Sequence, residues 1–151
     1  MLSTAVEGHS KRQFKNCHNY NINTLSVSPD GEHFISADDL TVNLWNIENH
    51  TTAYNLVDVK PETIADLSEV ITYVEFHPRR PDTFVFSSSK GYMCLCDLRQ
   101  ATTFAKSSIR FQAKEEPSRR HFFTDIINAM TRAKFAPTSD NYIFSRDYLS
   151  V

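Results

Sequence analysis

Cys94 and Cys96 are the residues whose type and spacing come nearest to a chemical site in this sequence. Residues two apart in a strand share a face, so both thiols would point the same way, as two ligands of one metal ion must. Structural zinc takes four ligands in a tetrahedral arrangement, and only Cys17 and His18 offer a further adjacent pair. We therefore expect the cysteines to serve in packing, with no metal and no cofactor bound.

Motifs for common enzyme chemistry do not occur in the sequence. There is no G-x-S-x-G, no H-E-x-x-H, no P-loop and no G-x-G-x-x-G, and the chain has only 3 glycines in 151 residues. Serines 87–89 fall in a predicted strand, where a nucleophile would also need a neighbouring base. The residues thus predict a protein that is not an enzyme.

Composition and charge indicate one folded, soluble domain. The chain has a mass of 17.4 kDa, with 40% hydrophobic and 23% charged residues. A net charge of −2 argues against binding nucleic acid through bulk charge. No apolar run approaches the ~20 residues of a membrane-spanning helix, and the N-terminus lacks the apolar segment of a signal peptide. We expect reduced thiols, no membrane partner, and a location in the cytosol with the nucleus as a second compartment.

Three segments of the chain share one plan, in which short strands rich in β-branched and aromatic residues alternate with turns. In each segment a proline follows the first strand and ends it, because proline has no N–H to donate; these are Pro29, Pro78 and Pro137. We expect strands at 22–28, 33–36 and 41–46, at 71–77, 83–89 and 92–97, and at 133–136 and 141–145.

Each of the two intervals between these segments predicts a short helix. Thr63 and Asp66 have the spacing of a capping box, and apolar residues at helical spacing follow at Ile64, Leu67 and Ile71. The second interval repeats that spacing at Phe123, Ile126, Ile127 and Met130. Residues 106–120 are polar and charged, and predict a surface loop.

The first segment resembles a WD40 repeat, from an opening His18 to a closing Trp45 followed by Asn46. In such repeats a histidine, a serine, an aspartate and a tryptophan join in one hydrogen-bond network, which satisfies these buried polar groups. The resemblance implies a structural network of His18, Ser36, Asp39 and Trp45, with Asp38 as the alternative acid. The other two segments read as degenerate copies, with Leu67 and Ile126 at the histidine position.

The predicted fold class is therefore all-β, a partial WD40 β-propeller of about three blades with short helical insertions. Propellers have about 4–8 blades, so we expect a fragment or truncated form whose last blade is incomplete and whose open edges self-associate. The expected units are a flank outside the match at 1–17, a blade at 18–60, a degenerate blade at 61–105, a charged loop and helix at 106–130, and a third, truncated blade at 131–151.

Five stretches carry a closer resemblance, to the WD40-type B regulatory subunits of serine/threonine protein phosphatase 2A. They are SADDLTVNLW at 36–45, EVITYVEFHP at 69–78, TFVFSSSKG at 83–91, FFTDII at 122–127 and RDYLSV at 146–151. The resemblance covers about residues 11–151 and the middle third of that family's chain. It implies a non-catalytic subunit that docks on the phosphatase scaffold and catalytic subunits and presents phosphoprotein substrates to them.

The same resemblance implies that Asp39, Leu67 and Val70 hold substrate, with Asp66 and Glu69 beside them. Residues 58–70 hold four acids and one lysine, which suits a peptide with a basic and an apolar side chain. Each residue also has a structural interpretation: a fold role for Asp39, core packing for Leu67, and a solvated face for the acids.

Two other functions stay open. The chain could be a general WD40 interaction module, or a non-productive truncated form, with other partners. The alternative from a different class is a hydrolase that uses histidine and aspartate on a propeller face.

Overall fold

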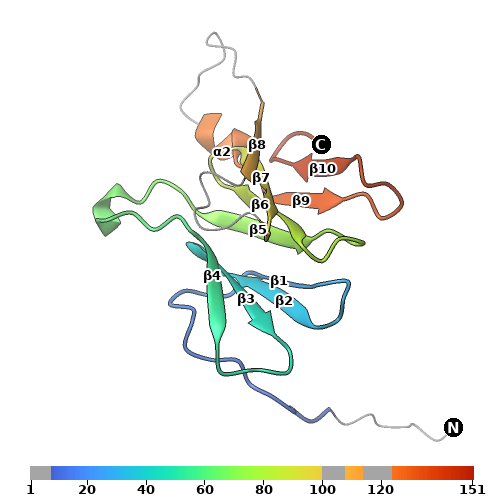
Figure 1. The fold of residues 1–151 in the computed structure, drawn as a ribbon. Helices are drawn as coiled ribbons and strands as arrows, with labels where there is room; N and C mark the ends of the chain where they lie inside the picture. The colour runs from blue at the N-terminus through green and yellow to red at the C-terminus, as the bar shows by residue number, and fades with distance from the viewer. Residues whose placement is uncertain (1–7, 100–107, 114–123) are drawn as a thin grey trace, which may run out of the picture.

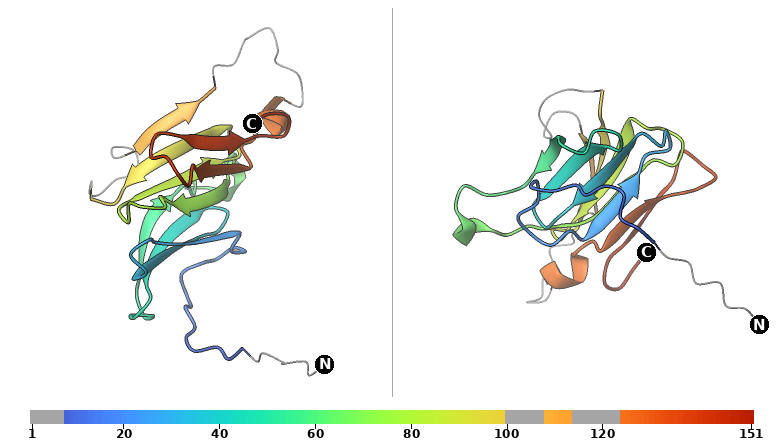
Figure 2. Two further views of the ribbon diagram at one scale, coloured as in Figure 1. Left: turned by 90° about the vertical axis from the view of Figure 1, so that its right-hand side faces the viewer. Right: turned by 90° about the horizontal axis from the view of Figure 1, so that it is seen from below.

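The computed structural model describes residues 8–99, 108–113 and 124–151, which form three antiparallel sheets stacked on one another (Figures 1 and 2). Sheet 1 has the strand order β1-β2-β3-β4, sheet 2 the order β5-β6-β7-β8, and sheet 3 pairs β9 with β10. The strands of sheet 1 are β1 (Thr24–Val27), β2 (His33–Ala37), β3 (Thr41–Asn46) and β4 (Ala53–Asp58). Those of sheets 2 and 3 are β5 (Ile71–Phe76), β6 (Thr83–Ser88), β7 (Tyr92–Asp97), β8 (Ser108–Gln112), β9 (Arg132–Phe135) and β10 (Ile143–Arg146).

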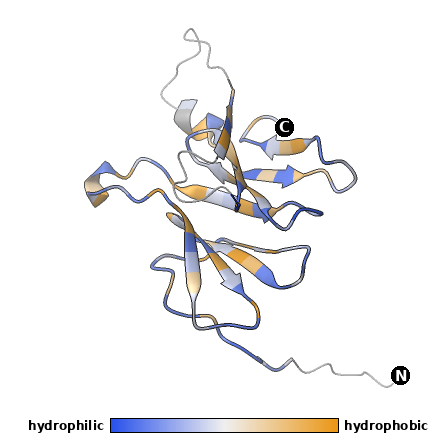
Figure 3. Cartoon of the chain, in the orientation of Figure 1, coloured by the Kyte–Doolittle hydropathy of each residue, from blue (hydrophilic) through white to orange (hydrophobic). Residues whose placement is uncertain are grey.

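Sheet 2 packs on both of its faces, because each sheet turns apolar side chains towards its neighbours. Between sheets 1 and 2 the core includes Ile35, Val42, Val74 and Phe86. The other face of sheet 2 meets sheet 3, where Val85 packs with Ala133 and Phe135. Figure 3 shows the hydrophobic residues gathered in the strands, whereas the connecting turns are mostly hydrophilic.

The first strands of the three sheets lie side by side and are joined by side-chain hydrogen bonds. The Phe76 N–H of β5 donates to Ser26 Oγ of β1 over 2.9 Å. The Phe135 N–H of β9 donates to the Glu75 carboxylate of β5 over 3.0 Å. These bonds hold the inner edges of the stack together, so that the turns at either end of each sheet keep a fixed relation to those of the next.

The helix expected at 63–71 is a single 3₁₀ turn, η1 (Ile64–Asp66), that buries none of its residues. Thr63 has extended backbone angles and makes no side-chain capping bond, and Ile71 already belongs to β5. A short helix without an apolar face to pack has little to stabilise it, which explains the difference. The second expected helix is α2 (Thr124–Asn128), and Phe123 lies outside the described residues. Within the described ranges, no helix has the length and apolar character needed to span a membrane.

The surface loop expected at 106–120 contains the fourth strand of sheet 2. Strand β8 pairs with β7, so that Ile109 faces Leu95 and Phe111 faces Met93 across the ladder. Sheet 2 therefore extends beyond the expected boundary at 105. The outermost strand is exposed along most of its length. Its short alternation of Ile109, Arg110 and Phe111 lies within a polar, charged stretch of sequence, which favoured the loop prediction. Residues 106, 107 and 114–120 of the expected loop lie outside the described residues.

The outward faces of sheets 1 and 3 expose apolar side chains. On β1, Leu25 and Val27 are 65% and 63% exposed, and on β10 Phe144 is 57% exposed. Apolar faces of this kind favour association with another protein surface. The self-association expected from the sequence remains a prediction.

Replacing Gly91 with alanine is expected to lower the free energy of unfolding by about 2–4 kcal/mol, against about 1 kcal/mol for the same change at Gly31. Both glycines have positive φ, +74° and +71°. At Gly91 an added Cβ would also lie 2.7 Å from the carbonyl oxygen of Asn128, whereas at Gly31 it would meet no atom within 4 Å. Urea denaturation of the two variants measures the difference, and equal losses would contradict the close approach of α2 to this turn.

Candidate functional site

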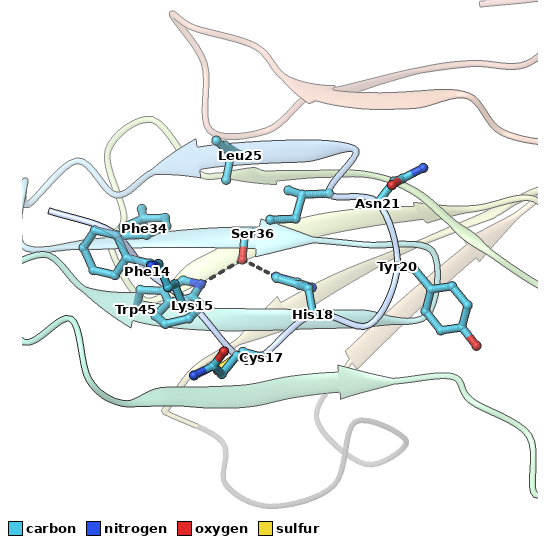
Figure 4. Close-up of a pocket in the computed structure, with 12 residues that line it drawn as sticks. Phe14, Lys15, Cys17, His18, Tyr20, Asn21, Leu25, Phe34, Ser36 and Trp45 are labelled. Atoms are coloured by element: carbon cyan, nitrogen blue, oxygen red, sulfur yellow. Dashed lines mark hydrogen bonds between the residues drawn. The ribbon is translucent and has the colours of Figure 1, made fainter. Parts of the chain in front are cut away.

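A buried hydrogen-bond network joins the segment before β1 to β2 and β3 (Figure 4). His18 Nδ1 lies 2.9 Å from the Asp38 carboxylate, and its Nε2 lies 2.6 Å from Ser36 Oγ. The indole N–H of Trp45 donates to the same Ser36 oxygen over 2.8 Å. With its proton on Nδ1, the histidine donates to the Asp38 carboxylate and accepts from the Ser36 hydroxyl. Each polar group of the network then has a hydrogen-bond partner.

The acid of this network is Asp38, not the Asp39 expected from the sequence. Ser36 lies in β2 and Asp38 follows the last residue of that strand, two positions further on, so both side chains lie on the same face. Asp39 is half-buried and bonds through its backbone carbonyl instead. Asp38 is 1% exposed, and its Oδ1 accepts from the backbone N–H groups of Leu40 and Thr41 over 2.8 and 2.7 Å. It therefore fixes the β2–β3 turn as well as the histidine.

Two opposing effects act on the pKa of Asp38. Burial alone would raise it, because the charged form loses its hydration. Hydrogen bonds from His18, from the Leu40 N–H and from Thr41 outweigh burial and hold the pKa of this carboxyl below its ordinary value of 3.8. The carboxylate is thus charged at neutral pH, as a partner of His18.

The N-terminal flank lies across sheet 1. The Phe14 ring meets the rings of Phe34 and Trp45 edge-on, with centroids 4.9 and 5.4 Å away. The Arg12 guanidinium donates to the Ile47 carbonyl over 2.6 Å. The described part of the flank therefore packs as part of the first unit, and the expected boundary between 17 and 18 does not separate it.

Ser36, His18 and Asp38 have the order of a hydrolase triad, and the first two line a pocket of about 590 Å³ (Figure 4). Burial argues against that chemistry. Ser36 is 1% exposed, and its oxygen already accepts the indole N–H of Trp45. A nucleophilic oxygen must reach a substrate carbonyl, so this geometry supports the structural role.

The structure brings two of the expected substrate residues, Asp39 and Val70, next to each other. The N–H of Ile71 donates to the Asp39 carbonyl over 2.8 Å, which ties the start of β5 to the β2–β3 turn. Val70 is held on its other side by Ser89, whose Oγ accepts its N–H and whose N–H donates to its carbonyl, both over 2.9 Å. The two turns and the segment before β5 thus form one bonded surface.

Leu67 and Asp66 lie in the segment between β4 and β5, which projects away from the sheets in Figure 1. Leu67 is 41% exposed, so it is not a core residue, and Asp66 is exposed. Val70 and Asp39 are half-buried. An exposed leucine among acids is consistent with the substrate role that the sequence suggested, which stays a prediction.

Glu69 differs from the other expected site residues, because its carboxylate turns into sheet 2. One oxygen accepts hydrogen bonds from Ser88 Oγ over 2.7 Å and from the Tyr92 hydroxyl. Lys90 Nζ lies 3.7 Å from the other oxygen. Burial and the nearby Glu69 charge raise the pKa of Tyr92, so its hydroxyl keeps the proton that it donates.

Cys94 and Cys96 are buried between sheets 1 and 2. Burial raises the pKa of the Cys94 thiol to about 11 and raises that of Cys96 as well. Metal binding needs thiolates, so these protonated thiols are suited to packing. In the part of the chain that the structure describes, no three histidine, cysteine or acidic side chains gather as metal ligands would.

Stacked antiparallel sheets with adjoining first strands, pinned by a His–Ser–Asp–Trp network, define part of a WD40-type β-propeller. The fold is similar to the β-propeller domain of Cps50 (Swd1) from Myceliophteria thermophila, with a TM-score of 0.59 and 18% sequence identity. That likeness covers 86% of this chain and 36% of the Cps50 chain.

Sequence comparison confirms the closer resemblance. The chain is 47% identical over 146 residues to the protein phosphatase PP2A 55 kDa regulatory subunit of Drosophila melanogaster, covering 97% of this chain and 29% of that protein. It is 46% identical over 150 residues to the B beta isoform of the serine/threonine-protein phosphatase 2A 55 kDa regulatory subunit of Carassius auratus, covering 99% and 34%. The chain thus spans about a third of the length of these relatives, and the match takes in the opening residues expected to lie outside it. No protein-family model matches the chain.

Proposed function

We propose that this chain forms a substrate-recognition surface of a B-type regulatory subunit of protein phosphatase 2A, and that it is not itself an enzyme. The observation that carries the proposal is the identity of 47% and 46% to two proteins named as such subunits, over nearly the whole chain. Regulatory subunits act by binding, and the buried Ser36 hydroxyl argues against hydrolysis by the triad-like group of Ser36, His18 and Asp38.

The recognition surface in this proposal consists of Asp39, Asp66, Leu67 and Val70. Leu67 supplies an exposed apolar anchor, and Val70 and Asp39 lie at the hydrogen-bonded junction of the β2–β3 turn with the start of β5. The acids of residues 58–70 favour a peptide with a basic side chain, while the leucine favours an apolar one. Buried apolar anchors give most of the affinity in such interfaces, and the acids speed the encounter at low salt.

Scaffold and catalytic subunits of the phosphatase are the proposed partners, and phosphoproteins the proposed substrates. An exchange of segments tests this. We expect a chimera, in which this chain replaces the matched 146 residues of the Drosophila protein, to co-purify with the scaffold and catalytic subunits. Failure to assemble, although the chimera is folded, would instead support a general WD40 interaction module with other partners.

In that chimera, Leu67→Ala and Asp39→Lys are each expected to weaken capture of a phosphoprotein substrate about tenfold, with scaffold binding unchanged. Ile64→Ala is the matched control, because Ile64 lies in the same segment and is 69% exposed. Affinity is measured by fluorescence anisotropy with labelled peptides that carry one arginine and one leucine. If both variants also lose the scaffold, the residues are structural, and if neither loses the substrate, the recognition surface lies elsewhere.

The same proposal places the chain in the cytosol, with the nucleus as a second compartment. It is supported by the three cysteines, which are all free, as in a reducing compartment. Imaging of the chain fused to a fluorescent protein tests it, and a secretory or membrane pattern would contradict it.

A further inference from the structure

Sheets 1 and 2 are equivalent strand for strand, so their β2–β3 and β6–β7 turns can be compared position by position. Phe34 of β2 pairs with Trp45 of β3, and Phe84 of β6 pairs with Cys96 of β7. Four residues after each phenylalanine come Asp38 and Ser88. Each of these accepts the backbone N–H two residues on, over 2.8 Å in sheet 1 and 3.1 Å in sheet 2.

Sheet 2 has no histidine in the place of His18, and the groups that form the network in sheet 1 are replaced. Trp45 is matched by Cys96, and Asp38 by Ser88. Thr41, four residues before Trp45, is matched by Tyr92, four residues before Cys96. The turn of sheet 2 therefore carries two hydroxyl donors where sheet 1 has its acid.

We infer that Glu69 takes the place of the histidine in sheet 2 and positions the segment between β4 and β5 that carries Asp66 and Leu67, rather than contacting substrate itself. Its carboxylate accepts from both turn hydroxyls, Ser88 and Tyr92. The acid thus changes place: in sheet 1 it lies on the turn and its partner His18 precedes the first strand, whereas in sheet 2 the acid precedes the first strand and its hydroxyl donors Ser88 and Tyr92 lie on the turn.

The neighbours of Glu69 hold this arrangement in place. Its side chain is 17% exposed, and Lys90 approaches its second oxygen from the turn. The guanidinium of Arg110 in β8 lies 3.6 Å from the centroid of the Tyr92 ring and covers it. Such a partly desolvated carboxylate with two hydroxyl donors forms stronger hydrogen bonds than an exposed one.

Glu69 directly precedes Val70, which is hydrogen-bonded on both sides by Ser89. On the other side of Val70, Ile71 is bonded to Asp39 of sheet 1. Glu69 therefore ties the C-terminal end of the projecting segment to sheet 2, only two residues after Leu67. Its loss would free the end of that segment from sheet 2.

This inference rests on the proposed function for its consequence in binding, but its structural part is tested separately. Amide hydrogen exchange in the 151-residue chain reports the bonds of Val70 and Ser89 directly. We expect Glu69→Ala to speed exchange at these two amides by about tenfold and leave Ile35 in β2 unchanged. Glu69→Gln keeps an acceptor oxygen and should restore most of the protection.

Asp66→Ala is the matched control, because it removes the same charge from the exposed part of the segment. It should leave the exchange of Val70 and Ser89 unchanged. In anisotropy with the arginine- and leucine-containing peptides, the weaker binding of Asp66→Ala should disappear in about 0.5 M NaCl, because salt screens exposed charges. The weaker binding of Glu69→Ala should persist at this salt concentration, because Glu69 acts through the position of the segment.

Two outcomes would overturn the inference. One is unchanged exchange at Val70 and Ser89 in Glu69→Ala, and the other is equal acceleration at Ile35, which would mean loss of the whole fold. If the unmodified chain and the chimera capture no peptide, but exchange follows the expected pattern, Glu69 keeps its positioning role and the proposed function fails instead.

Discussion

Replacing Asp38 with alanine is expected to lower the free energy of unfolding by about 3–5 kcal/mol, because it leaves buried partners without their acceptor. His18 and the backbone N–H groups of Leu40 and Thr41 all donate to this carboxylate. Both side chains of the pair are buried, at 7% exposure for His18 and 1% for Asp38. Chemical denaturation followed by the fluorescence of Trp45 measures the loss.

Asp39→Ala is the matched control, one residue away. Asp39 is half-buried, and its described hydrogen bond uses the backbone carbonyl, which alanine retains. We expect a change within about 0.5 kcal/mol, as for substitutions away from buried networks. A larger loss of unfolding free energy in Asp39→Ala than in Asp38→Ala would mean that Asp39 is the acid of the network, as the sequence predicted.

The contribution of Asp38 should also depend on pH. Its pKa in the folded chain lies below the ordinary 3.8, so the unfolded state binds the proton more readily. The stability that it adds is therefore fully present above that ordinary value and is lost as the pH falls through the lower folded value. The stability difference between the unmodified chain and Asp38→Asn should shrink accordingly in acid. A difference that stays constant below pH 3.8 would contradict the lowered pKa.

Trp45→Ala is expected to cost about 3–5 kcal/mol, the loss typical of removing a large buried aromatic side chain. Trp45 is 3% exposed and stacks on Phe34 with centroids 6.0 Å apart, while Phe14 meets it edge-on. Its indole N–H also binds Ser36. The change would therefore open a cavity and leave a buried hydroxyl short of one partner.

The control for this change is Trp45→Phe, which keeps most of the apolar volume and removes the N–H. We expect it to cost about 1–3 kcal/mol, as for a lost buried hydrogen bond. Thermal unfolding followed by circular dichroism suits both variants, because neither retains the tryptophan. An unchanged midpoint in Trp45→Ala would mean that the residue does not anchor the N-terminal flank to sheet 1.

The inner strands and the donors of the network could be read from the sequence alone. Strands β3 and β7 lie at the expected 41–46 and 92–97. Both faces of these strands are covered, so their sequences are rich in the apolar and β-branched residues that predict a strand. His18, Ser36 and Trp45 meet as their spacing indicated. Local periodicity and turn residues suffice for features of this kind, since they depend on the pleat of a single strand.

Other features were decided only by the tertiary structure. The choice of Asp38 over Asp39 depends on which face β2 presents, and β8 is a strand because β7 offers it a free edge. The turn of Glu69 into sheet 2 depends on Ser88 and Tyr92, which lie 19 and 23 residues further along the chain. A polar side chain takes its role from the partners that desolvate it and bond to it, and those partners meet only when the sheets stack.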